Sequence, residues 1–126
     1  MATTTITRAR GAATAVVWTL SILCAAMFLF AGGSKLAGQA EMVQVYETIG
    51  LGQWFRYLTG IIEVTGAALL LVPSLAFYGA AALAVTMVGA IIAHLFVIGG
   101  NPLVPIVLLA ATSTIAYLRR PDLSNS

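Results

Sequence analysis

The chain has 126 residues, of which 60% are apolar and 8% are charged, and its formal net charge is +2. Soluble domains carry about a quarter charged residues, so this composition excludes an ordinary soluble domain and indicates a membrane protein. No basic patch with interleaved aromatic residues is present, which does not favour a nucleic-acid partner. Because a helical span takes roughly 20 residues, residues 1–126 have room for one membrane domain with about four spans.

The first apolar segment covers residues 12–33. Arg8 and Arg10 precede it, as in the positive flank of a signal peptide, but the segment is longer than the apolar part of a typical signal. We therefore interpret it as a first span. The single cysteine, Cys24, lies within it, so the chain cannot form an intrachain disulfide or a CxxC pair.

A connection with helical periodicity follows at about residues 38–50. Its apolar residues recur at positions i, i+3, i+4 and i+7: Met42, Val45, Tyr46 and Ile49. This spacing predicts an amphipathic helix that ends at Gly50 or Gly52 and that lies on the membrane surface or caps the bundle.

Three further apolar segments cover residues 55–72, 75–98 and 103–118. Pro and Gly residues separate them, and such short connections predict antiparallel neighbours. The predicted fold is an all-α integral membrane protein: an antiparallel four-transmembrane-helix bundle with a short amphipathic helix between the first and second spans.

Orientation follows from the positive charges. With four spans both termini share one side, which carries Arg8, Arg10, Arg119 and Arg120. On the opposite side Lys35 and Arg56 are diluted by two glutamates, so we expect both termini to be cytoplasmic.

Glu63 is the most informative residue, because a charge inside an apolar segment costs several kcal/mol and is a functional-site candidate by default. It lies seven residues beyond Arg56, or about 10 Å below the outer face. His94 lies about 6 Å below the same face, and Lys35 follows the first segment there. We therefore predict that Lys35, Arg56, Glu63 and His94 form a polar cluster in the outer half of the bundle.

Small residues accompany this cluster. Gly60 and Gly66 share the face of Glu63, and Gly89 shares the side of His94, which predicts that these faces turn inward and meet. The helix-packing candidates are Gly32, Gly60, Gly66 and Gly89.

Each polar residue also has a structural interpretation. Lys35 and Arg56 are suited to anchor helices at the interface, and His94 to lie in water or donate between helices. Glu63 is suited to an interhelical hydrogen bond or ion pair. A single histidine disfavours a bis-histidine haem, and the sequence has no metal-ligand spacing and no known catalytic motif. We expect no metal site, assign no catalytic residue and do not expect an independent enzyme.

Three segments carry a resemblance to a known family: FLFAGGSKLAG at residues 28–38, RYLTGIIEVTGAALLLVP at 56–73 and MVGAIIAHLF at 87–96. Their order, G-x-K, then E-x-x-G before a Leu run, then A-H, resembles the DoxX-like family of small four-helix bacterial membrane proteins. The resemblance covers residues 16–118, and the family pattern falls on Gly32, Lys35, Glu63, Gly66 and His94.

The resemblance implies a bundle in the bacterial cytoplasmic (inner) membrane that is associated with quinone-linked redox systems. Named members are small subunits of a terminal quinol oxidase and of thiosulfate:quinone oxidoreductase, and others resemble partners in oxidative-stress complexes. This chain lacks the extra soluble domain of some sulfur-oxidising relatives and has no cysteine pair, so we do not expect it to oxidise thiosulfate alone.

Our hypothesis from the sequence is a multi-pass accessory subunit whose partners are the lipid bilayer and other redox subunits, with a second copy of the chain as a further candidate. Lys35, Glu63 and His94 would line a pocket for a quinone-like ligand; His94 or Lys35 would donate to its carbonyl, and Glu63 would orient that donor or exchange a proton. Two alternatives stay open. One is a purely structural assembly subunit, and the other is a small proton-coupled exporter, although four-span exporters carry their membrane glutamate in the first helix.

Overall fold

The computed structural model describes residues 2–121, which contain five α-helices, one π-helical turn and no strand. The predicted all-helical class is therefore confirmed. The elements are α1 (Ala2–Ala37), α2 (Ala40–Ile49), α3 (Gln53–Leu70), α4 (Ala76–Ala93), the π-helical turn η1 (His94–Ile98) and α5 (Leu103–Leu118).

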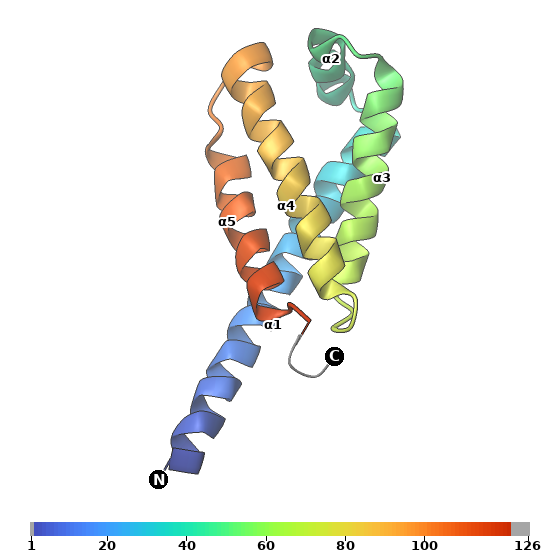
Figure 1. The fold of residues 1–126 in the computed structure, drawn as a ribbon. Coiled ribbons are helices and arrows are strands. Elements are labelled where there is room, and N and C mark those ends of the chain that lie inside the picture. The colour runs from blue at the N-terminus through green and yellow to red at the C-terminus, as the bar shows by residue number, and fades with distance from the viewer. Residues whose placement is uncertain (1, 122–126) are drawn as a thin grey trace.

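The four long helices pack in pairs along the molecule (Figure 1). α3 contacts α1 on one side and α4 on the other, and α5 contacts both α4 and α1. The short helix α2 lies at the end of the molecule opposite the two chain termini, against α3 and η1 (Figure 1). Two helical stretches are long and apolar enough to cross a membrane, Arg10–Ala37 and Ala76–Ile98, and α5 is a shorter apolar helix of 16 residues.

Helices α1 and α2 are each followed by a glycine with a positive φ. Gly50 has a φ of +83° and its N–H donates to the carbonyl of Tyr46 at 3.2 Å, so α2 ends at the first of the two glycines considered from the sequence. Gly38, with a φ of +73°, follows the end of α1. α1 is therefore longer than the apolar segment 12–33, and Lys35 lies in its last turn rather than after it. The backbone hydrogen bonds of α1 continue for one more turn beyond residue 33, where the apolar segment ends.

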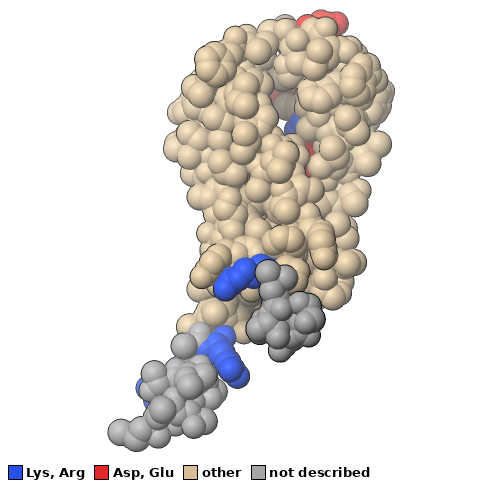
Figure 2. All heavy atoms as spheres, in the orientation of Figure 1, with Lys and Arg blue, Asp and Glu red and all other residues tan. Residues whose placement is uncertain are grey.

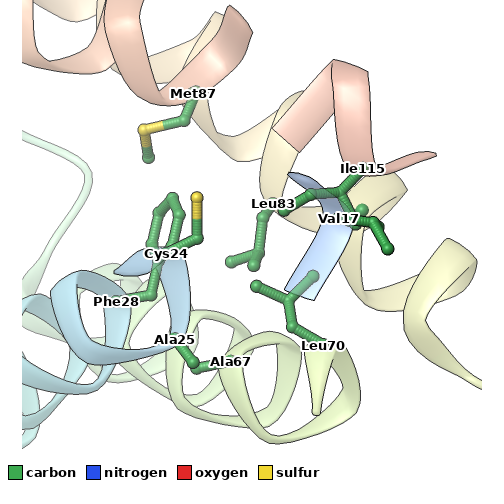
Figure 3. Close-up of a cluster of buried hydrophobic side chains, with 10 residues drawn as sticks. Val17, Cys24, Ala25, Phe28, Ala67, Leu70, Leu83, Met87 and Ile115 are labelled. Atoms are coloured by element: carbon green, nitrogen blue, oxygen red, sulfur yellow. The ribbon is translucent and has the colours of Figure 1, made fainter. Parts of the chain in front are cut away.

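The hydrophobic core lies in the half of the molecule away from α2. Figure 3 shows its side chains at close range. Its residues come from four helices: Val17, Cys24, Ala25 and Phe28 of α1, Ala67 and Leu70 of α3, Ala80, Leu83 and Met87 of α4, and Ile115 of α5. Phe28, Leu70 and Leu83 are fully buried there. The four helices are thus held together in this half, and they leave room between α3 and α4 in the half that carries α2.

Two glycines bring α1 and α3 close together in the half that carries α2. A Cβ at Gly32 would lie 2.9 Å from the carbonyl oxygen of Gly60, and a Cβ at Gly60 would lie 3.1 Å from that of Gly32. Gly66 faces α4, where a Cβ would lie 2.7 Å from Cγ of Leu83. Gly89 differs from the prediction made for it, because a Cβ there would meet no atom within 4 Å. Its side of α4 faces open space rather than a neighbouring helix.

We predict that Gly32→Ala destabilises the protein and that Gly89→Ala does not. The first substitution pushes a methyl group into the backbone of α3 and should cost about 1–3 kcal/mol, as overpacking does. The second adds a methyl in open space and improves helix propensity. Thermal unfolding in one detergent, followed by circular dichroism, compares the two variants. Equal melting temperatures would contradict the close packing of α1 on α3.

Candidate functional site

A cavity of about 430 Å³ lies between α2, α3 and the C-terminal half of α4 with η1. Its walls are mainly apolar, and the four residues of the amphipathic face of α2 all contribute to them: Met42, Val45, Tyr46 and Ile49. Figure 2 shows the hollow from the side, with acidic and basic atoms visible inside it. Lys35, Glu63 and His94 line the cavity, so three of the four residues predicted to form a polar cluster share one space.

An ion pair between α1 and α3 forms the charged part of the cavity. Nζ of Lys35 lies 2.7 Å from Oε1 of Glu63, whose side chain is 2% exposed, whereas that of Lys35 is 14% exposed. This contact is a close ion pair between the last turn of α1 and the middle of α3. Each charge neutralises the other, as a buried charge requires.

The position of this pair follows from the local sequence. Gly32 lies one turn before Lys35 on α1, and Gly60 lies one turn before Glu63 on α3. Since these two glycines bring the helix backbones together, the side chains that follow them meet across the same contact. The inward face of α3 that the sequence predicts is also observed, because Arg56, Gly60, Glu63 and Gly66 are all buried.

His94 lines the cavity from a π-helical turn, whereas Lys35 and Glu63 lie on α-helices. It begins the π-helical turn η1, and its Nδ1 lies 2.9 Å from the carbonyl oxygen of Gly99. Gly99 has a φ of +70°, a conformation that favours glycine. Short π-helical turns occur often at functional sites, because they change which side chains face inward. No periodicity in the sequence signals this turn.

Arg56 does not line the cavity, although the sequence places it in the same cluster. Its side chain is only 5% exposed, its Nη1 donates to the carbonyl oxygen of Lys35, and its Nε donates to Oε1 of Gln53 at 2.7 Å. The guanidinium also lies 4.3 Å from the centre of the Tyr57 ring. Arg56 thus holds the last turn of α1 by its backbone, where a cation is favoured by the helix dipole. It is buried rather than extended to the interface as an anchor.

Sequence reasoning did not propose three further polar residues of the cavity as site candidates: Tyr46, Thr59 and Thr86. Thr59 and Thr86 each donate to a carbonyl of their own helix at 2.8 Å, so their hydroxyl oxygens can only accept from a ligand. Tyr46 is buried, and this burial raises its pKa, which keeps its phenol neutral at physiological pH. The signal for Tyr46 was its position on the apolar face of the amphipathic helix, which we expected to lie on the membrane surface or to cap the bundle.

The site has the composition of a small-molecule pocket. Apolar walls and a few polar groups that fix orientation are typical of ligand sites of roughly 300–1,000 Å³. Among residues 2–121, no group of three or more His, Cys, Asp or Glu side chains gathers in a way that would hold a metal ion. The arrangement can therefore bind an apolar body with polar substituents and exchange protons with them.

We predict that Arg56→Ala destabilises the protein far more than Arg120→Ala. Both arginines donate to a backbone carbonyl and lie over a tyrosine ring, but Arg56 is buried and Arg120 is exposed. Loss of a buried charged hydrogen bond should cost roughly 2–3 kcal/mol, whereas the exposed contact should cost under about 1 kcal/mol. Denaturant unfolding in detergent measures both values. An equal effect at the two positions would contradict the role of Arg56 in holding α1.

Comparison with known proteins places the chain in a family. The family model described as the DoxX-like family matches residues 19–115, well over half of the chain and including Lys35, Glu63 and His94. No curated protein and no solved structure matches the chain. The family and the two apolar helices together indicate a membrane protein. The resemblance drawn from the three sequence segments is thus confirmed, and the chain belongs to the DoxX-like family.

Proposed function

We propose that this protein is an integral membrane accessory subunit of a quinone-linked redox or oxidative-stress complex, and that its cavity binds a quinone-like ligand. One observation carries the ligand proposal: a mainly apolar cavity of about 430 Å³ contains the Lys35–Glu63 ion pair and His94. A quinone has the matching chemistry, since it combines an apolar ring with polar oxygens at the ring edge.

The polar groups take distinct roles in this proposal. The ammonium of Lys35 has three N–H donors and faces one carboxylate oxygen at 2.7 Å, so donors remain for a ligand oxygen. Glu63 orients Lys35 and is the group with which it would exchange a proton. The chain itself supplies binding and proton exchange, and electron transfer belongs to the partner subunits of the complex.

The proposed setting is the bacterial inner membrane, crossed four times by α1, α3, α4 and α5 as antiparallel neighbours, with both termini in the cytoplasm. Large apolar side chains on the outer surface support it, among them Phe30, Phe96 and Val107. Arginines near both chain ends gather at one end of the molecule, as the positive-inside rule requires of a cytoplasmic face (Figure 2). The cavity then lies in the outer half, within reach of lipid-soluble molecules.

A second candidate function is supported by the same contacts. The Lys35–Glu63 pair and the buried Arg56 hold α1 on α3, which is what a purely structural assembly subunit would need. The two functions differ in one respect: a structural subunit has no use for the open volume beside the pair.

We predict that Ala93→Phe abolishes binding of a short-tailed benzoquinone and leaves the fold intact. Ala93 lines the cavity and is only half-buried, so a phenyl ring there would occupy part of the volume that a ligand needs. Glu63→Gln should weaken binding roughly tenfold, because Lys35 loses the charge that orients it. Binding to protein in lipid nanodiscs is measured by titration calorimetry.

Glu41→Gln is the matched control for charge removal, since Glu41 is exposed on α2 and should bind like the unaltered protein. Melting temperatures of all variants separate lost binding from lost folding. If the unaltered protein bound no quinone, or if Ala93→Phe bound it as well, the cavity would not be a ligand site and the structural function would be favoured.

We also predict the membrane orientation. With Cys24 replaced by Ser, Gln39→Cys at the start of α2 should react with a membrane-impermeant maleimide added outside intact cells, and Pro121→Cys should not. Both positions are exposed, so they differ only in the side of the membrane that they occupy. After the cells are permeabilised, both should react. Labelling of Pro121→Cys in intact cells would contradict cytoplasmic termini.

A further inference from the structure

The hydrogen bond of His94 determines which of its ring nitrogens carries a proton. Nδ1 lies 2.9 Å from the carbonyl oxygen of Gly99, and a carbonyl oxygen can only accept. Nδ1 must therefore be the donor. In the neutral imidazole Nε2 then carries a lone pair and no proton, so it can only accept a hydrogen bond.

The backbone around His94 makes this contact a fixed feature of the fold. Gly99 and Gly100, with φ values of +70° and +82°, turn the chain directly after η1, so that the Gly99 carbonyl faces back toward the ring. A Cβ at Gly100 would lie 3.8 Å from Nδ1, so the turn passes close to the ring on that side. Nδ1 is occupied by the turn, and Nε2 is the ring nitrogen that remains for a ligand.

We propose that the cavity selects ligands that present a hydroxyl group to His94, and hence the reduced hydroquinone form over the quinone. This inference rests on the proposed function and names the ligand class of the same site. The hydroxyl of a hydroquinone donates a hydrogen bond to Nε2. A quinone carbonyl oxygen is itself an acceptor, so it would form no hydrogen bond with Nε2 and would repel it. The role is opposite to the one expected from the sequence, in which His94 donates to a carbonyl.

The other polar groups of the cavity are compatible with a hydroxyl-bearing ligand. Thr59 and Thr86 use their protons within their own helices, so both offer only lone pairs to the cavity. Lys35 supplies N–H donors, which a hydroxyl oxygen accepts as readily as a carbonyl does. These groups accommodate a hydroxyl-bearing ligand without choosing it over a carbonyl, so the choice falls to His94. The proposal concerns binding alone and requires no electron transfer.

The experiment has a ligand-free readout, because His94 is the single histidine of the chain. Protein labelled with ¹⁵N-histidine and held in nanodiscs, at a pH at which the imidazole is neutral, should carry the ring proton on Nδ1. Binding is then compared, without oxygen, for three probes with the same short alkyl tail: a hydroquinone, the matching benzoquinone and the hydroquinone dimethyl ether. The hydroquinone should bind roughly fivefold to tenfold more tightly than the other two, as expected for one added hydrogen bond.

Two substitutions test the roles of Nδ1 and Nε2 independently. His94→Asn keeps an amide donor near the position of Nδ1 for the Gly99 carbonyl but has no acceptor at the position of Nε2. It should bind all three probes about equally and retain its melting temperature. His94→Gln places an amide near the position of Nε2 that can donate or accept, and it should bind quinone and hydroquinone alike while still discriminating weakly against the ether.

The outcomes distinguish this inference from the proposed function. Quinone binding as tight as or tighter than hydroquinone binding would overturn the inference and leave a quinone-binding cavity. An imidazole with its proton on Nε2, or a His94→Asn variant that still prefers hydroquinone, would also overturn the inference. Absence of binding for all three probes would overturn both proposals together.

Discussion

The close approach of α1 and α3 is the constraint on which the rest of the structure depends. Gly32 and Gly60 face each other with no room for a Cβ, and one turn beyond them Lys35 and Glu63 meet at 2.7 Å. A buried charge is costly unless it is paired. The close approach that the two glycines allow is what brings Lys35 and Glu63 within pairing distance. Arg56 strengthens the same contact by binding the carbonyl of Lys35. The packing of two helices thereby places the charged part of the cavity.

The two halves of the molecule differ in how their helices pack. In one half, Phe28, Leu70 and Leu83 fill the space among four helices. In the other half α2 lies against α3 and η1, and a cavity of about 430 Å³ remains beside the ion pair. Gly89 belongs to this open half, which explains why a small residue there contacts no helix. The proposed ligand site therefore lies beside a packed core, which can hold the fold while the cavity stays open.

The polar residues of the site were predictable to different degrees. The depths of Glu63 and His94 follow from the rise of a helix, which is nearly constant, so the sequence could bring them to one level. Their direction around the helix axis was inferable for Glu63, because small residues share its face on α3. Arg56 lies only two turns away on that face, yet it binds the backbone of α1 and not the cavity. Periodicity identifies a face but cannot identify the partner that the face meets.

The sequence by itself determined the helical class, the membrane character, the family and the end of α2 at a glycine, since these depend on composition, period and local backbone preference. The tertiary structure alone decided that α1 continues through Lys35, that the apolar face of α2 lines a cavity, and that Nδ1 of His94 is taken by Gly99. These features arise from contacts between segments distant in the chain or from a π-helical turn, which leaves no mark in the hydrophobic pattern. For that reason the sequence could bring Lys35, Glu63 and His94 together, while the place of Arg56 and the hydrogen bond of His94 could be decided only by the tertiary structure.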